Sequence, residues 1–173
     1  MAKKVNETTI NMGVYAGSTE YIGVAQVTMP TITYKTETID GAGIPGDYDS
    51  VMIGQTDPLN MGVQFRGMTR DVVGLLASNN NIIELRPVIQ TRELGGAPKL
   101  AGQKHVMVCQ PKSLNAGTLA PKTKQDVPIE FSVTRWEAFE DGRRVLLIDK
   151  LNFIHEIDGV DHMRELRKKM GRN

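Results

Sequence analysis

Residues 129–157, IEFSVTRWEAFEDGRRVLLIDKLNFIHEI, decide the fold. Their first half places apolar residues at alternate positions, which is the period of a strand with one buried face. The residues in this pattern are Ile129, Phe131, Val133, Trp136 and Ala138. The alternation slips by one residue before Trp136, so we predict a β-bulge near Arg135. Asp141-Gly142 then predicts a tight turn, and the whole stretch is predicted to be a β-hairpin.

The return strand of this hairpin is expected to run from residue 143 to residue 157 almost without a break. At about 3.3 Å per residue it would span roughly 50 Å, whereas a domain of this length has a radius of about 16 Å. A strand longer than the body exposes an edge that must be paired or blocked to avoid aggregation. Pairing with neighbouring subunits in a closed ring would satisfy that edge, so the hairpin favours a self-assembling protein.

Outward from the hairpin, most of the chain also has strand character. The expected strands are residues 21–29, 31–39, 60–67, 82–94 and 104–114. Short helices are expected over 69–78, with Thr69 as N-cap, and over about 159–170, ending at Gly171. An extended loop is expected over about 40–58. We therefore predict a single domain over residues 1–173, mainly β, with an antiparallel β-sandwich or β-barrel-like fold and one or two short α-helices.

Size and composition are those of an ordinary globular protein. The chain has 173 residues, of which 40% are hydrophobic and 24% are charged, so it is long enough to bury a core. No apolar run reaches the roughly 20 residues that cross a bilayer, and no signal peptide is recognised, so we expect no membrane anchor. The single cysteine, Cys109, rules out an intrachain disulfide and fits a reducing cytoplasm.

The residues that could carry chemistry are few and badly spaced for it. His105 and Cys109 are four residues apart on an expected strand, so about 13 Å separates them, too far for a thiolate–imidazole pair. His155 and His162 lack a third ligand at metal-binding spacing. The glycine run at 41–46 matches G-x-G-x-x-G, but acidic residues follow it where a dinucleotide site needs a helix. The sequence therefore predicts no catalytic residue, no metal site and no cofactor.

Two sets of residues, one near each end of the chain, form a pattern by their order and spacing. The first set is Gly23-Val24-Ala25, Met29-Pro30, a Thr-rich charged strand, Gly41-Ala42-Gly43 and Gly46. The second set is Asp141-Gly142, Ile148-Asp149, Leu151-Asn152-Phe153-Ile154, Gly159-Val160-Asp161 and Met170-Gly171. Together they resemble the major tail tube proteins of contractile-tailed phages and of R-type tailocins. The segment 94–124 departs from the pattern of that family and is longer.

This resemblance implies a structural subunit of the inner tail tube and not an enzyme. Its hexameric rings would stack into a hollow conduit for DNA or ions through the host envelope, in a phage virion or a tailocin particle assembled in the host bacterial cytoplasm. The implied partners are further copies of itself, the sheath protein, and tape-measure, baseplate and tail-terminator proteins, with DNA only as non-specific passing cargo. The contact with a neighbouring ring would be made by the loop residues Gly41, Ala42, Gly43, Gly46 and Asp47.

The uneven distribution of charge suggests which segments would face the lumen. The net charge of the chain is +1, but residues 1–60 hold three Lys or Arg against seven Asp or Glu, a net −4, which leaves +5 for the rest. An acidic wall would repel DNA and avoid phosphate contacts that slow its passage. Glu20 and Glu37 are therefore the expected lumen-facing residues. Arg164, Arg167 and Lys168 of the basic C-terminal helix are expected to contact the sheath or a neighbouring subunit.

Two other classes of function remain open at this point. A small β-barrel ligand-binding or enzyme domain would place His105 or Cys109 in its pocket, and would be favoured by an aromatic lining, yet aromatic residues are only 5% of the chain. A nucleic-acid-binding module that uses the basic C-terminus would need aromatic side chains on which bases stack. Rings or tubes in electron micrographs would favour the structural subunit, and featureless monomers would favour the alternatives.

Overall fold

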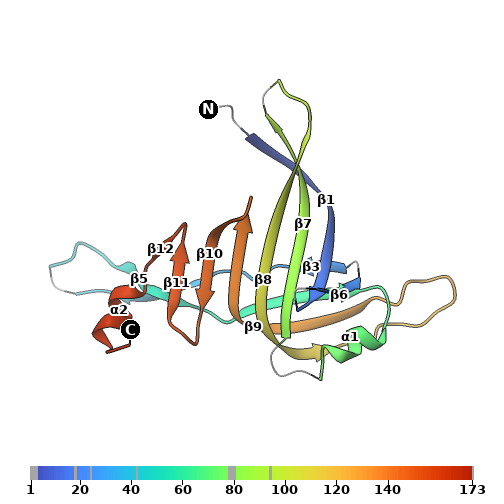
Figure 1. The fold of residues 1–173 in the computed structure, drawn as a ribbon. Helices are drawn as coiled ribbons and strands as arrows, with labels where there is room; N and C mark the ends of the chain where they lie inside the picture. Colours follow the sequence, from blue (N-terminus) through green and yellow to red (C-terminus); the bar gives the residue numbers. More distant parts are fainter. Residues whose placement is uncertain are drawn as a thin grey trace.

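The computed structural model describes residues 4–17, 19–23, 25–41, 43–77, 81–93 and 95–172, and Figure 1 shows their fold. The strands are β1 (Lys4–Ala16), β2 (Glu20–Gly23), β3 (Ala25–Thr28), β4 (Tyr34–Ile39), β5 (Tyr48–Thr56), β6 (Leu59–Phe65), β7 (Asn81–Glu93), β8 (Lys99–Leu114), β9 (Val127–Glu140), β10 (Arg143–Asp149), β11 (Ile154–Ile157) and β12 (Val160–Asp161). The helices are α1 (Arg70–Gly74) and α2 (Arg164–Lys169). The predicted mainly antiparallel β fold with two short helices is confirmed.

Ten of these strands form one open sheet. Its main path runs β12-β11-β10-β9-β8-β7-β1-β2, while β6 pairs with the first half of β9 and carries β3 on its other side. In Figure 1 the strands β1, β7 and β8 stand upright, and β3 and β6 cross behind them. The first and last strands of the path do not pair in the described residues, so the sheet is not closed into a barrel. The crossing layer gives the sheet a covered face and an open face.

The core lies where β6 and β3 cross the long strands. Alternate residues of β6 and β9 are buried there, namely Leu59, Met61, Val63, Phe65, Val127, Ile129, Phe131 and Val133. Ile83 and Leu85 of β7 and Met107 of β8 complete the same cluster. The period-two pattern of β6 and of the first half of β9 therefore supplies a large part of the buried core.

The predicted bulge and turn of the last hairpin are confirmed. Val108 pairs with Arg135 and Cys109 pairs with Val133, so Thr134 is the extra residue of β9. Beyond this bulge the buried side passes to Trp136 and Ala138, as the sequence pattern predicts. At the hairpin turn Asp141 and Gly142 both have positive φ, 47° and 79°.

The unbroken return strand is wrong, because the chain turns between β10 and β11. Asp149 causes the turn: its Oδ1 accepts hydrogen bonds from the backbone N–H groups of Leu151 and Asn152, at 3.1 and 2.9 Å. Asp side chains often accept hydrogen bonds from backbone N–H groups a few residues further on, and these bonds compete with the hydrogen bonds between strands. The overlong strands of the fold are instead β1, β7, β8 and β9, with 13, 13, 16 and 14 residues. Of these, β1 was not predicted as a strand at all.

Both helices are shorter than predicted. α1 has the expected N-cap, since Thr69 Oγ1 accepts from the backbone N–H of Val72 at 3.3 Å, but it covers only residues 70–74, and Ser78 lies outside the described residues. α2 begins at Arg164 rather than near residue 159. Asp158 and Gly159 have positive φ and form a turn between β11 and β12, so the helix cannot begin until that turn is complete.

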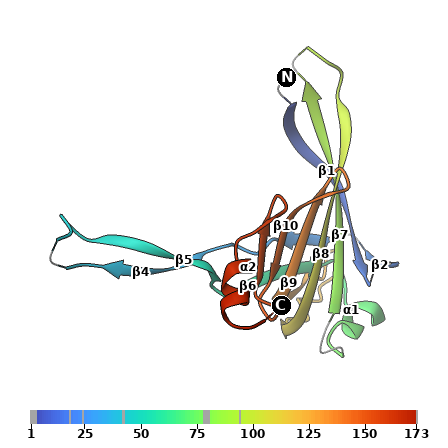
Figure 2. The ribbon, with the colours of Figure 1, turned by 60° about the vertical axis from the view of Figure 1, so that its left-hand side comes forward.

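The predicted extended loop over 40–58 is largely a β-hairpin. Residues 48–56 of that segment are strand β5, which pairs with β4 as a separate two-stranded sheet. We call residues 34–56 the arm. Figure 2 shows that the arm projects well away from the rest of the molecule. Only the stretch between the two strands keeps the loop structure that the sequence suggests.

Candidate assembly surfaces

The outer edge of β1 is the longest unpaired backbone of the large sheet. On one side β7 pairs with β1 from Lys4, opposite Glu93, to Ala16, opposite Ile83. On the other side β2 pairs only with residues 14–16. Within the described residues, 4–13 therefore present a row of backbone groups with no strand beside them. The main path of the sheet ends on its other side in the two-residue strand β12, so this path has two edges to which another strand could add, besides the free edge of the four-residue strand β3.

The arm exposes apolar and acidic side chains together. Its exposed apolar residues are Ile44, Tyr48, Val51 and Ile53, the last with 71% of its surface accessible. Its exposed acidic residues are Glu37, Asp40, Asp47 and Asp49. Exposed apolar side chains gathered on a projecting hairpin are typical of an interaction site. The arm is therefore a second candidate contact surface.

Three contacts fix the base of the arm to the body. Tyr34 Oη lies 3.0 Å from His155 Nε2 of β11. Lys150 Nζ donates to the carbonyl oxygens of Thr56, at 3.2 Å, and of Asp57. Gly54 lies directly against the buried side chain of Met163, with no room for a Cβ atom between them. The direction of the arm is thus set by residues more than ninety positions further along the chain.

The predicted inter-ring residues lie at the tip of the arm. Gly41, Gly43 and Gly46 have φ of 148°, 100° and 113°, a region that side-chain-bearing residues rarely adopt. No other atom lies within 4 Å of a Cβ built on any of them, and Asp47 is exposed. Ala42 lies outside the described residues. These residues form an exposed turn, and their contact with another ring stays a prediction.

The predicted contact residues of the C-terminal helix have different surroundings. Arg167 is held within the subunit: its guanidinium donates to Asp161 Oδ2 at 2.5 Å and to the carbonyl oxygen of Phe153 at 2.7 Å. Burial would raise the pKa of Asp161, but the hydrogen bond from Arg167 and those from backbone N–H groups outweigh it and lower the pKa. Arg164 and Lys168 are exposed. Contact with a sheath or a neighbour stays a prediction for all three residues.

The two predicted lumen residues are exposed but do not lie together. Glu20 begins β2 at the edge of the large sheet, opposite Ala16, and Ala16 packs toward the core. Glu37 lies in β4 of the arm, in the other sheet. A shared lumen position for them stays a prediction.

Comparison with known proteins identifies the family. Residues 6–171 match the family model described as "Phage tail tube protein FII". The chain belongs to this family of phage tail tube proteins. The tail tube protein of Escherichia phage P2 is 27% identical over 167 residues, which cover 92% of this chain and 94% of that protein.

Two solved structures share the tail tube fold. One is the sheath/tube terminator of an extracellular contractile injection system, PVC, in its extended state, with TM-score 0.57, 16% identity, and coverage of 78% of this chain and 97% of that one. The other comes from the PVC sheath–tube complex in the extended state, with TM-score 0.51, 19% identity, and coverage of 75% and 88%. At these identities the likeness concerns the fold.

A tail tube protein is a structural protein and not an enzyme, and the two residues weighed for an enzyme site fit that conclusion. Cys109 is fully buried, its Sγ lies 3.6 Å from the carbonyl oxygen of Asn81, and burial raises the pKa of its thiol to about 12. Such a thiol is unreactive at neutral pH. His105 Nδ1 faces the indole Nε1 of Trp136 at 3.5 Å. Neither tail tube residue is arranged as a nucleophile with a base.

The described residues of the tail tube protein lack two further features. In the part of the chain that the structure describes, no three His, Cys, Asp or Glu side chains gather as they would around a metal ion. Neither described helix has the length and apolar character needed to span a membrane.

Sequence reasoning missed two of the tail tube protein's candidate surfaces. The edge of β1 was overlooked because KVNETTINMG is rich in Thr and Asn and has no apolar alternation. The base of the arm was overlooked because Tyr34 and His155 are 121 residues apart. The Thr residues favour strands and were the only local signal for β1.

His155 is expected to make the tail tube subunit sensitive to acid at the base of the arm. The residue is 2% exposed and its Nδ1 has no hydrogen-bond partner in the described residues. Burial lowers the pKa of His155, nearby His162 lowers it further, and Asp161 opposes both. The folded-state pKa thus lies below the unfolded value, so this contribution to stability is complete above about pH 6.5 and declines as the pH falls toward the folded-state pKa.

We therefore expect the free energy of unfolding to fall on acidification from about pH 7 to about pH 5, by about 1.4 kcal/mol for each unit by which the pKa is lowered. Urea titrations of wild type and His155→Gln across this range measure the slope. Burial also lowers the pKa of His105. The same titrations of His105→Gln measure how much of the slope comes from that residue. A wild-type slope that His155→Gln leaves unchanged would contradict the prediction.

Proposed function

We propose that this tail tube protein forms hexameric rings that stack into the hollow inner tube of a contractile tail. The observation that carries the proposal is the open main path of the sheet, which has a free edge at each end. Adding the β1 edge of one copy to the β11–β12 edge of the next continues the sheet from subunit to subunit. Repeating that step closes a ring, and closure satisfies backbone groups that a lone subunit leaves exposed. Six as the number of subunits follows from the resemblance to contractile tail tubes.

Stacking of the rings is proposed to use the arm. Val51 and Ile53 on one side of β5 and Tyr48 on the other, together with the turn that holds Gly43 and Asp47, would be covered by the neighbouring ring. The arm suits this role because it projects from the body (Figure 2) while its base is fixed at Tyr34 and His155. A fixed direction limits the conformational entropy that the arm loses on docking.

The proposed partners follow from the same assembly. The solved structures with this fold come from a sheath–tube complex and a sheath/tube terminator, which supports sheath and terminator proteins as partners of this tube. Arg164 and Lys168 on α2 are the side chains proposed for the sheath or neighbour contact. Tape-measure and baseplate proteins are the remaining partners, and DNA is passing cargo. We place the subunit in a phage tail or tailocin particle, assembled in the host bacterial cytoplasm.

Assembly is measurable on the purified protein. Analytical ultracentrifugation and negative-stain electron microscopy over a rising concentration series should give hexamer-multiple masses, rings and then tubes. Added sheath protein should lower the concentration at which tubes form, by mass action. A protein that stays monomeric at every concentration, with and without sheath protein, would refute the proposal.

A further inference from the structure

The open face of the large sheet, opposite the layer formed by β3 and β6, carries a balanced set of charges. Four acidic and four basic side chains lie there, across five neighbouring strands: Glu84, Arg86, Lys104, Arg135, Glu137, Arg144, Asp149 and Glu156. Residues opposite one another in an antiparallel sheet point to the same side. The pairs Glu84–Val106, Val106–Glu137, Glu137–Leu147 and Leu147–Glu156 therefore place the acidic residues in one row across this face. We call it the ion-paired face.

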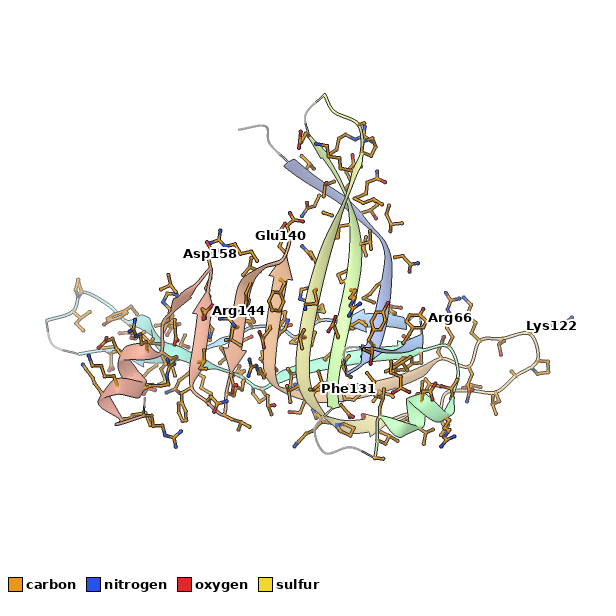
Figure 3. The ribbon with its side chains drawn as sticks, in the orientation of Figure 1. Arg66, Lys122, Phe131, Glu140, Arg144 and Asp158 are labelled. Atoms are coloured by element: carbon orange, nitrogen blue, oxygen red, sulfur yellow. The ribbon has the colours of Figure 1, made fainter. Side chains whose placement is uncertain are left out.

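Each acidic side chain of this face has a basic partner on the same face. Arg135 contacts Glu137 at 2.6 Å and Asp149 at 3.6 Å. Arg144, labelled in Figure 3, contacts Glu156 at 2.9 Å and Glu137 at 3.6 Å. These contacts join two neighbouring arginines through Glu137, so the network continues from β9 through β10 to β11.

The other two basic side chains of the face, Arg86 and Lys104, also have partners. Arg86 contacts Glu84 at 2.5 Å and lies over the ring of Tyr15, 4.5 Å from its centroid. Lys104 lies over the ring of Phe139, 4.7 Å from its centroid. The cations are thus occupied by carboxylates or aromatic rings, and the face has no net charge from these eight residues.

We infer that this ion-paired face is the wall of the conduit, an inference that rests on the proposed ring. When the sheet closes, one face must turn toward the axis. The other face already carries the crossing layer of β3 and β6 and the packed core, which would fill the centre if it turned inward. The open face is therefore the inner one.

A wall of this kind suits a conduit for a polyanion. Binding of DNA gains free energy when Lys and Arg release counterions from phosphates, once for each phosphate contacted. On the ion-paired face those cations already have carboxylate or aromatic partners, so a passing duplex gains little by displacing them. Balanced charge also avoids a net repulsion that would oppose entry. The wall inferred here does not include Glu20, which shares the core-facing side with Ala16, or Glu37, which lies in the arm.

Cysteine labelling of assembled tubes tests which residues face the lumen. The single native thiol, Cys109, is fully buried, so the wild-type protein serves as the unlabelled reference. In Lys104→Cys tubes, a small maleimide should react and a maleimide on a long polyethylene glycol chain should be excluded, whereas dissociated subunits should react with both. Thr118→Cys, in the exposed loop between β8 and β9, should react with both reagents in tubes.

The outcomes distinguish an error in the wall assignment from an error in the proposed tube. Tubes in which Lys104→Cys reacts with the large reagent would overturn the wall assignment and leave the tube intact. Failure of the wild-type protein to form any ring or tube would refute the proposed function, and the wall with it.

Charge substitution tests the reason for the pairing. Glu137→Gln removes the carboxylate shared by Arg135 and Arg144 and adds one positive charge per subunit. Tubes of this variant should bind a short DNA duplex about tenfold more tightly than wild-type tubes at low salt, with the difference lost at high salt. Glu165→Gln on the exposed side of α2 makes the same charge change away from the face and should not. Equal binding by the two variants would overturn the inference.

Discussion

Replacing Thr8 or Thr9 of β1 with proline is expected to weaken ring formation in one of the two variants while its subunit stays folded. The two residues pair consecutively with Gln90 and Ile89 of β7, so their N–H groups point to opposite edges of the strand. One proline removes a hydrogen bond inside the subunit. The other removes a donor from the free edge, where only a neighbouring subunit would miss it.

The two variants should therefore fail in different assays. The proline that faces β7 should lower the free energy of unfolding by about 1–3 kcal/mol, the cost of an unsatisfied backbone group. The proline at the free edge should instead raise the concentration needed for assembly about ten- to hundredfold. Urea unfolding and sedimentation measure the two effects separately. Thr118→Pro, in the exposed loop between β8 and β9, is the matched control. Wild-type assembly by both β1 variants would show that this edge is not the ring contact.

Gly54→Ala is expected to loosen the arm and lower the stability of the subunit. Gly54 has φ of 66°, and a Cβ atom there would collide with the Sδ and Cγ atoms of Met163, which is only 4% exposed. Left-handed backbone costs a residue with a side chain about 1–2 kcal/mol, and overpacking a filled site costs about 1–3 kcal/mol more. The total is a large share of the 5–15 kcal/mol that stabilises a typical domain.

Gly17→Ala separates the two causes. Gly17 has nearly the same φ, 63°, but no other atom lies within 4 Å of a Cβ at that position, so it should lose only the backbone contribution. The double variant Gly54→Ala/Met163→Ala should lose less stability than the sum of the losses of Gly54→Ala and Met163→Ala, because removing the Met163 side chain relieves the collision. Urea unfolding measures the totals, and limited proteolysis within residues 40–57 reports the loosened arm. Equal losses for Gly54→Ala and Gly17→Ala would show that Met163 does not fix the arm.

Features that depend on neighbouring residues were predictable from the sequence. The alternation in β6 and β9, the bulge at Thr134, the turn at Asp141-Gly142 and the N-cap of Thr69 all follow from side chains within a few positions of one another. The turn at Asp149 was equally local, since its partners are two and three residues away. It was misread because the surrounding apolar residues suit a continuous strand.

The candidate surfaces depended on contacts that local patterns do not encode. The sequence by itself determined that the chain is mainly β, carries no catalytic arrangement and contains the pieces of a tail tube protein. Only the tertiary structure decided that β1 is an edge, that the arm is fixed by Tyr34 at His155, and that Arg135, Glu137 and Arg144 share one face. The physical reason is that period and turn chemistry act over a few residues, whereas the pairing of an edge and the partner of a charge are chosen by strands that meet only after the whole chain has folded.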